Sequence, residues 1–276
     1  MDRRDFLKTS GVALGGLLGI GGGAYSSELK EFYGMLVDTT MCNGCRSCEE
    51  ACAKANELLM PDLEDKNIFN EKRKTSTDAF TVVNKYKTSK GEVFVKKQCM
   101  HCNQPACASA CLVKAMLKTK EGPVIWRENC MGCRYCMIAC PYDIPKFEYN
   151  SLNPRIRKCT FCFEKIKKGE EPACSSTCPT EALLFGKRGE LIEIANERIY
   201  KNPDKYIHHI YGEAEAGGTG WLYLSSVSFE ELGFPANIGT TPYPEYTKEF
   251  FHTVTLVFLL VPTFLLGLNK ALKKDE

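Results

Sequence analysis

The chain has 276 residues, which is enough for one or two domains with a hydrophobic core. Its 36 Lys and Arg nearly balance its 34 Asp and Glu, so the formal net charge is only +2. Because the chain has no strong overall field, we expect no nucleic acid or acidic polymer as a partner. The unusual feature of the composition is its sixteen cysteines.

The N-terminal segment, residues 1–26, has the composition of an export signal. Arg3 and Arg4 precede a weakly apolar, glycine-rich stretch over residues 11–23. This order predicts a twin-arginine signal, which addresses a route for proteins that are already folded, with cleavage after Ser26. An ordinary N-terminus with a chance pair of arginines is the alternative.

The sixteen cysteines form four groups of four. The first and third groups have the spacing C-x2-C-x2-C-x3-C, which is the bacterial ferredoxin pattern, and the other two groups lengthen the loop before the third cysteine. In this pattern three thiolates bind one [4Fe–4S] cluster and the fourth binds another cluster. We therefore predict four [4Fe–4S] clusters. The groups are Cys42, Cys45, Cys48 and Cys52; Cys99, Cys102, Cys107 and Cys111; Cys130, Cys133, Cys136 and Cys140; and Cys159, Cys162, Cys174 and Cys178.

Disulfide bonds and zinc binding are two alternative roles for the cysteines. Export leads to an oxidising compartment that favours disulfides, but thiols in C-x2-C runs lie too close and point in the wrong directions to pair locally. Zinc also binds C-x2-C pairs, but a zinc site would leave the x3-C cysteines without a role. Both alternatives are therefore weaker than iron–sulfur clusters.

Short strands and helices are expected around the cysteine groups, so the predicted class is α+β. Residues 63–91 are polar and lack periodicity, which predicts a connection followed by a hairpin between Phe80 and Val95. Residues 191–248 are rich in Tyr and Gly and are predicted to form an extension that contacts partners. The expected strands are Val93–Lys97, Val124–Trp126 and Trp221–Val227, and the expected helices are Cys52–Leu59 and Cys111–Leu117.

The histidines and basic pairs have competing interpretations. His101 lies between two cysteines and can either donate a hydrogen bond to a cluster or pack in the core. We expect His208 and His209 to belong to the extension rather than to a metal site. His252 is either an interfacial residue or a contact to haem or quinone. Basic pairs next to the cysteines, such as that at positions 96 and 97, are solvated or offset the negative charge of clusters.

Residues 249–269 are predicted to form a transmembrane helix. The run from Phe250 to Leu268 has no charged residue, and at 1.5 Å per residue it spans about 28 Å, close to the thickness of the bilayer core. Lys270, Lys273 and Lys274 follow and are expected in the cytoplasm, which puts the body of the protein in the periplasm. A buried helix of a soluble domain is the alternative.

At this point the chain resembles a known family, the four-cluster ferredoxin-type electron-transfer subunits of membrane-bound molybdenum and nickel enzymes. This family includes formate dehydrogenase beta subunits and dimethyl sulfoxide reductase iron–sulfur subunits. The resemblance covers residues 35–190. The matching segments are Met41–Cys48, Gln98–Cys102, Pro105–Cys107, Cys140–Asp143, Arg157–Cys162 and Cys178–Ala182.

The resemblance implies which cysteines share a cluster. Groups one and four would form one ferredoxin-like unit, and groups two and three a second unit, inserted at about residues 92–145. The implied ligand sets are Cys42, Cys45, Cys48 and Cys178; Cys159, Cys162, Cys174 and Cys52; Cys99, Cys102, Cys107 and Cys140; and Cys130, Cys133, Cys136 and Cys111.

The resemblance also implies partners. A twin-arginine signal and an anchor on one chain most resemble the electron-transfer subunit of the periplasmic [NiFe] hydrogenase-2 type, which would act with hydrogenase small and large subunits and a quinone-reactive or cytochrome b membrane subunit. A formate dehydrogenase beta subunit, or that of another molybdopterin oxidoreductase, is the alternative. No nucleophile triad, nucleotide fingerprint or acid–base pair stands out, so we expect no substrate site. A complete redox enzyme would need an open iron position, which sixteen ligands for four clusters disfavour.

Overall fold

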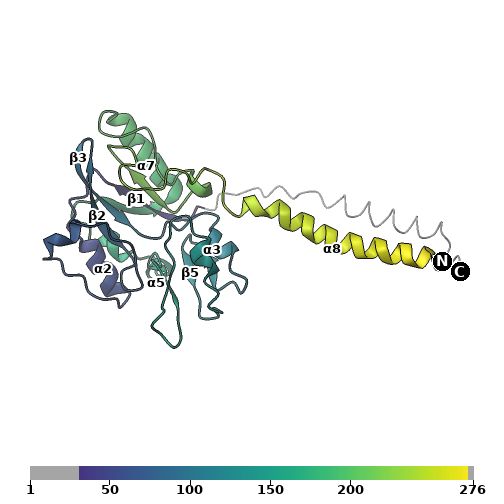
Figure 1. Ribbon diagram of the computed structural model, residues 1–276. Coiled ribbons are helices and arrows are strands. Elements are labelled where there is room, and N and C mark those ends of the chain that lie inside the picture. The colour runs from purple at the N-terminus through teal and green to yellow at the C-terminus, as the bar shows by residue number, and fades with distance from the viewer. Residues whose placement is uncertain (1–30, 273–276) are drawn as a thin grey trace. The chain divides into compact units, whose positions relative to one another are not determined.

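The computed structural model of the protein describes residues 31–272 (Figure 1). The predicted twin-arginine signal, residues 1–26, lies outside the described residues, as do Lys273 and Lys274. A compact unit begins at Phe32 and mixes short helices with short strands, in agreement with the predicted α+β class.

A three-stranded sheet joins parts of the chain that are far apart in sequence. Its middle strand, β1 (Tyr33–Asp38), pairs antiparallel with β8 (Leu183–Lys187) and parallel with β9 (Trp221–Leu224). The predicted strand at 221–227 therefore forms, but it ends earlier because the Ser225 hydroxyl accepts the N–H of Val227 at 3.1 Å in a local turn. Part of the segment predicted to be an extension thus belongs to the core sheet.

The two faces of this sheet have different neighbours because side chains alternate along a strand. One face packs on α7 (Arg188–Lys201), whose buried residues recur every four positions and form one apolar stripe. The other face points toward cysteines of the first, second and fourth groups. The first face bears Leu36, Leu222 and Leu224 on Leu191, Ala195 and Ile199, and the second bears Met35, Val37, Trp221 and Tyr223.

A hairpin and two short strand pairs complete the sheets among the described residues. The predicted hairpin is confirmed: β2 (Val82–Thr88) pairs antiparallel with β3 (Gly91–Lys97) across a two-residue turn. The smaller pairs are β4 (Met116–Lys118) with β5 (Val124–Trp126), and β6 (Lys146–Phe147) with β7 (Ile156–Arg157). Strand β5 has the predicted bounds.

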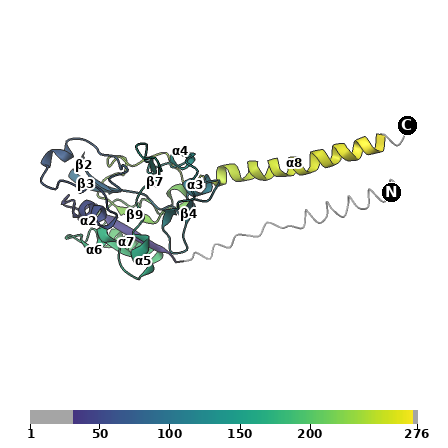
Figure 2. The same ribbon diagram turned by 90° about the horizontal axis from the view of Figure 1, so that it is seen from below.

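Short helices contain the third cysteine of each of the four groups. The longest, α2 (Ser47–Ala55), also contains the fourth cysteine of its group. The others are α3 (Ala106–Ser109), α4 (Tyr135–Ile138) and α6 (Ala173–Ser176). A further helix, α5 (Phe163–Lys167), follows Cys162, and 3-10 turns lie at Lys66–Phe69 and Glu215–Gly217. In both views α2 and α3 lie at opposite ends of the body (Figures 1 and 2).

The predicted helix bounds after the x3-C cysteines are wrong. Helix α2 begins before Cys52 and ends before Leu59, because Glu57 adopts a left-handed conformation with φ of 52°. The helix expected at 111–117 does not form. Lys114 has a φ of 53°, and the Cys111 sulfur accepts the N–H groups of Ala115 and Met116, so these amides are not available to a helix.

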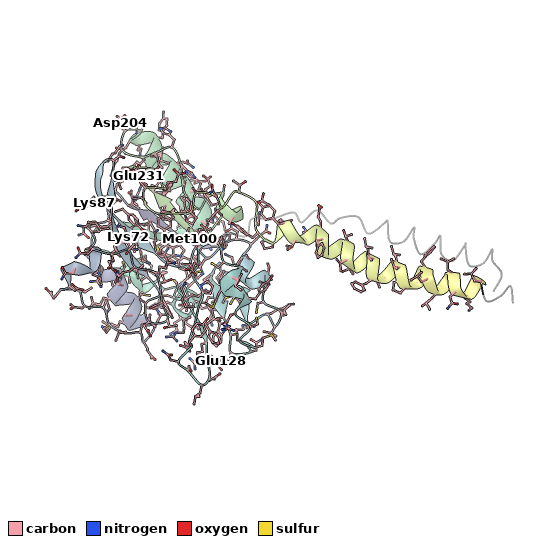
Figure 3. All side chains as sticks on the ribbon, viewed as in Figure 1. Lys72, Lys87, Met100, Glu128, Asp204 and Glu231 are labelled. Carbon is pink, nitrogen blue, oxygen red and sulfur yellow. The ribbon has the colours of Figure 1, made fainter. Side chains whose placement is uncertain are left out.

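The C-terminal element is a single long helix, α8 (Glu245–Leu272), which includes Pro262. Within residues 245–270, an 18-residue window has a mean hydropathy of 2.0 and none of it is buried, so α8 is long and apolar enough to cross a membrane (Figure 3). The hydroxyl groups of Thr253 and Thr263 donate to the carbonyls of Glu249 and Leu259, four residues earlier, and so need no outside partner. The side chain of His252 lies outside what the structure describes.

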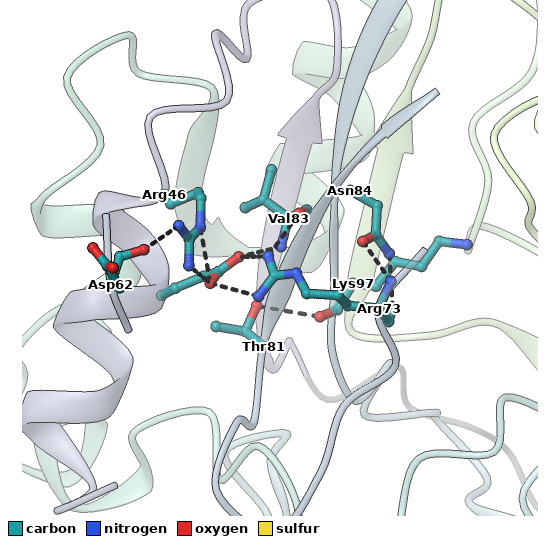
Figure 4. A network of polar contacts seen from close by, with 8 residues as sticks. Arg46, Asp62, Arg73, Thr81, Val83, Asn84 and Lys97 are labelled. Carbon is teal, nitrogen blue, oxygen red and sulfur yellow. Dashed lines mark hydrogen bonds and ion pairs between the residues drawn. The ribbon is translucent and has the colours of Figure 1, made fainter. Parts of the chain in front are cut away.

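A buried charge network ties α2 to the hairpin (Figure 4). The Glu49 carboxylate accepts hydrogen bonds from the guanidinium groups of Arg46 at 3.1 Å and Arg73 at 2.5 Å, and from the N–H of Val83 at 2.5 Å. Asn84 exchanges two hydrogen bonds with the backbone of Arg73, which holds that arginine in place. Because Glu49 is 5% exposed, its charge depends on these partners.

We therefore expect Glu49→Ala to destabilise the protein. The change leaves the buried Arg46 without its carboxylate, and loss of one partner of a buried ion pair costs about 3–5 kcal/mol. Thermal unfolding of the purified protein measures the effect, and Glu50→Ala, an exposed position on the same helix, is the matched control. Equal melting temperatures for the two variants would contradict the role of the network.

The loop of the first cysteine group depends on glycine. Gly44 has a φ of 76°, and a Cβ at this position would lie 2.5 Å from Cδ1 of Phe94. Gly169 has nearly the same φ, 78°, but a Cβ there would meet nothing within 4 Å. The two glycines thus differ in contact and not in backbone conformation.

We expect Gly44→Ala to be more destabilising than Gly169→Ala, by about 1–3 kcal/mol, because only the first substitution overpacks its surroundings. Melting temperature and iron content of the two variants provide the measurement. If the two substitutions cost the same, the contact with Phe94 has no influence and backbone strain alone accounts for the loss.

Candidate metal centres

The C-x3-C spacing at the end of each group places two cysteines one helical turn apart. Residues at i and i+4 of a helix are neighbours, with Cβ atoms about 5–6 Å apart. In α2 these positions are Cys48 and Cys52, and across α6 they are Cys174 and Cys178. Each pair therefore presents two thiols that are close to each other but can face different cavities.

The structure contains two cavities, each lined by four cysteines. Each cavity combines the first three cysteines of one group with the last cysteine of another, so the two groups exchange their fourth members. The first cavity is lined by Cys42, Cys45, Cys48 and Cys178, here called set 1, and the second by Cys52, Cys159, Cys162 and Cys174, here called set 2.

The remaining eight cysteines form two further groups of interacting thiols. Set 3 consists of Cys99, Cys102, Cys107 and Cys140, and set 4 of Cys111, Cys130, Cys133 and Cys136. Burial raises the pKa of Cys102 to about 12, and the thiols of Cys99 and Cys140 contribute to the rise. Burial raises the pKa of Cys136 to about 11, with contributions from the other three thiols of set 4.

The four sets follow one another through the body. Cys48 of set 1 and Cys174 of set 2 pack in one apolar cluster, and Cys174 adds to the effect of burial that raises the pKa of Cys48. Cys99 of set 3 packs with Cys52 and Cys159 of set 2 in another apolar cluster. Sets 3 and 4 meet in one apolar cluster that contains Cys107 and Cys136. The thiols thus form a series in the order set 1, set 2, set 3, set 4.

Exposure differs between the ends and the middle of this series. Cys45 in set 1 and Cys133 in set 4 are exposed, whereas sets 2 and 3 contain no exposed cysteine. The two outer sets are therefore accessible from outside the protein, and the two inner sets are shielded from solvent.

Buried N–H groups without a partner show that the surroundings fit a sulfur-rich cofactor. Trp221 lines the set 2 cavity, and its Nε1 is buried without an acceptor among the described residues. His101 is fully buried, and its Nδ1 accepts the N–H of Val124 at 2.8 Å, so Nε2 carries the hydrogen and also has no described partner. A buried, unpaired donor costs about 1–3 kcal/mol, which sulfur acceptors of a cluster would offset.

His101 packs in the core, where its ring stacks on that of Phe161 at 5.0 Å, and the alternative role as a hydrogen-bond donor to a cluster stays untested. Burial and the neighbouring Lys158 lower the pKa of His101 well below its usual value, so the ring is neutral. Trp221 was not predicted as a site residue. Its position follows from the pairing of β9 with β1, which local sequence does not reveal.

The spacing of the thiols argues against zinc. Among the described residues, no three His, Cys, Asp or Glu side chains converge closely enough to bind one metal ion. Zinc with thiolates at about 2.3 Å needs sulfurs within roughly 4 Å of one another, whereas a [4Fe–4S] cube lies between its thiolates and holds them farther apart. His209 Nε2 and Oε1 of Glu215 lie 2.7 Å apart, at hydrogen-bond distance.

Comparison with known proteins agrees with this chemistry. The 4Fe-4S dicluster domain family matches residues 91–188. A protein of Nitratidesulfovibrio vulgaris is 43% identical over 289 aligned positions, which cover 100% of this chain and 78% of that protein. The hydrogenase-2 operon protein HybA of Escherichia coli O157:H7 is 32% identical over 100% of this chain and 96% of its own length.

A second type of relative covers less of the chain. The iron-sulfur subunit of the nitrate-inducible formate dehydrogenase of Escherichia coli K12 is 34% identical over 68% of this chain and 66% of its own length. The sixteen cysteines and these relatives together fit four [4Fe–4S] clusters. The chain therefore belongs to the family of four-cluster, ferredoxin-type electron-transfer subunits that includes the hydrogenase-2 protein HybA and the formate dehydrogenase iron-sulfur subunits.

Proposed function

We propose that this protein passes electrons through four [4Fe–4S] clusters between a periplasmic catalytic subunit, a [NiFe] uptake hydrogenase, and a quinone-reactive subunit in the membrane. The observation that carries the proposal is the series of four thiol sets with exposed cysteines at its two ends only. Electrons can enter or leave at an exposed end, while the inner clusters are protected from solvent and from side reactions.

Sets 1 to 4 are the proposed ligands of the four clusters. Sets 1 and 2 would form one ferredoxin-like unit, and sets 3 and 4 the unit inserted at about residues 92–145. The cavities lined by sets 1 and 2 support this assignment, as do the electrostatic effects among the thiols within sets 3 and 4. Each bound cluster supplies one-electron chemistry, and the protein holds it in place and shapes its surroundings.

The residues around the thiols set the electronic properties of this path. Backbone N–H groups donate to ligand sulfurs, as Phe161 does to Cys159 at 3.3 Å and Ala115 to Cys111 at 3.2 Å. Such hydrogen bonds stabilise negative charge on sulfur and so favour the reduced cluster. The burial of sets 2 and 3 keeps water away. These roles require no substrate site in this subunit.

The proposed location is the periplasmic face of the inner membrane, reached by the twin-arginine route, with α8 as the anchor in the lipid bilayer. The length and hydropathy of α8 support this role, and Lys270 at its end fits a cytoplasmic terminus. Large apolar side chains near set 4 are exposed, which fits a partner subunit at that end. They are Leu112, Met131, Tyr135 and Ile138.

The hydrogenase partner is preferred over a formate dehydrogenase because the similarity to HybA extends over the whole chain. The formate dehydrogenase subunit matches 68% of it. If the similarity to the formate dehydrogenase subunit reflects the function instead, the expected partner is a molybdopterin protein.

Purification of the full-length protein from detergent-solubilised membranes tests this proposal. We expect a [NiFe] large subunit to copurify, because electrons from the chain need a catalytic acceptor or donor. A molybdopterin protein in its place would support the formate dehydrogenase alternative. Recovery of the chain alone in the soluble fraction would contradict both the partner and the anchor.

The exchange of fourth cysteines gives a sharper test of the ligand sets. The intact protein should contain about sixteen irons per chain, and fewer than about twelve would contradict four cubanes. Cys52→Ala and Cys162→Ala are expected to alter the cluster with the same midpoint potential, because both cysteines belong to set 2. Cys45 belongs to the same motif as Cys52 but to set 1. Cys45→Ala should therefore alter a different cluster.

Redox titration followed by electron paramagnetic resonance distinguishes these variants. If Cys52→Ala and Cys45→Ala instead affect one and the same cluster, each motif binds its own cluster with all four cysteines and the proposed exchange is wrong.

A further inference from the structure

Lys96 is a buried lysine that lines two thiol cavities at once. It lies near the end of β3, is 3% exposed, and forms part of the wall of both the set 1 and the set 2 cavities. We propose that the Lys96 ammonium group is a cation shared by two neighbouring clusters, and that it raises the reduction potentials of both. This inference rests on the proposed ligation by sets 1 and 2.

The ionisable groups that act on Lys96 are cysteine thiols, which would be negative thiolates as cluster ligands. Cys48 of set 1 and Cys52, Cys159 and Cys174 of set 2 act on it electrostatically. Its other contacts are neutral: Nζ donates to Oε1 of Gln98 at 3.0 Å and lies 4.5 Å from the ring centroid of Trp221. Within residues 31–272 no carboxylate lies at ion-pair distance from Nζ. A buried ammonium group needs negative charge nearby, and here ligand sulfurs are the groups that provide it.

A closed set of hydrogen bonds fixes the position of this cation. Gln98, which accepts from Nζ, donates from Nε2 to the Tyr223 hydroxyl at 2.6 Å. Tyr223 in turn donates to the backbone carbonyl of Lys96 at 3.0 Å. Gln98 is 2% exposed and Tyr223 is fully buried, so water does not compete with these bonds. The ammonium group is therefore held between the cavities rather than free to turn outward.

The electrostatic consequence follows from the charge that a cluster gains. Reduction adds one negative charge to a cluster whose thiolates already make it negative, and a fixed cation nearby favours that state. Because Lys96 borders both cavities, both clusters feel the same cation. Burial strengthens the effect, since the surroundings screen charge less than water does.

The effect of Lys96 on reduction potentials should not extend to sets 3 and 4. At set 3 a different buried cation, Lys158, acts on Cys107 and Cys140, and its Nζ donates to the carbonyl of Cys159 at 3.0 Å. At set 4 the ionisable groups that act on Cys136 are the other cysteines of that set. Lys96 thus belongs to sets 1 and 2.

Lys96→Met tests the proposal in the full-length, cluster-loaded protein, because methionine keeps much of the shape and removes the charge. Redox titration followed by electron paramagnetic resonance should show two of the four potentials lowered and two unchanged. The expected change in each reduction equilibrium is tenfold or more, which corresponds to 59 mV for one electron. The altered pair should be the clusters that Cys45→Ala and Cys162→Ala affect.

Two control variants separate charge from packing. Lys97→Met removes the adjacent lysine, whose Nζ donates to the Gly233 carbonyl and which lines neither cavity, and it should leave all four potentials unchanged. Lys96→Arg keeps the positive charge and should keep both potentials close to their original values.

The outcomes are distinguishable. Four unchanged potentials in a Lys96→Met protein with full iron content would overturn the proposal, and a shift of one cluster alone would overturn the shared role. If the Lys96→Met protein loses iron, the Gln98→Glu variant is titrated in its place. A carboxylate beside Nζ offsets the positive charge of Lys96 and should lower the same two potentials. Fewer than four clusters in the unaltered protein would count against the proposed function and not against Lys96.

Discussion

The arrangement of the metal centres depends on one geometric constraint, the single helical turn between the third and fourth cysteines of each group. Because one turn brings positions i and i+4 side by side, Cys48 and Cys52 are neighbours, yet they line different cavities. The same holds for Cys174 and Cys178. A short helix thus serves as the wall between two thiol-lined cavities.

The sheet provides the rigid support for this wall. Its strands alternate between a face covered by α7 and a face that carries Trp221 and Tyr223 toward the thiols. Strand β9, which supplies both residues, lies about forty positions beyond the last cysteine in the sequence and reaches β1 by parallel pairing. The segment after the cysteines therefore contributes to the wall of a thiol-lined cavity.

Buried charges divide into two kinds in this protein. Glu49 is satisfied by two arginines and a backbone amide, so its network stabilises the attachment of α2 to the hairpin. Lys96 has neutral hydrogen-bond partners and faces thiols. The first network is complete in the polypeptide alone, whereas the second becomes electrically balanced when the sulfurs carry negative charge. The first network stabilises the fold, and the second carries the proposed control of electron affinity.

Cysteine spacing, alternation and a charge-free run are local patterns, so the cofactor class, the hairpin and the long apolar helix could be predicted from the sequence. It did not determine the short helices correctly, since a positive φ at Lys114 and the hydrogen bonds to the Cys111 sulfur override helix propensity there. Cysteine spacing alone left open which thiols share a cavity, and the family resemblance implied the sets that line the two cavities. The buried groups that face the thiols became visible in the fold. Trp221 and Lys96 meet beside set 2 because β9 and β3 converge in space, and no local pattern records a contact between residues more than a hundred positions apart.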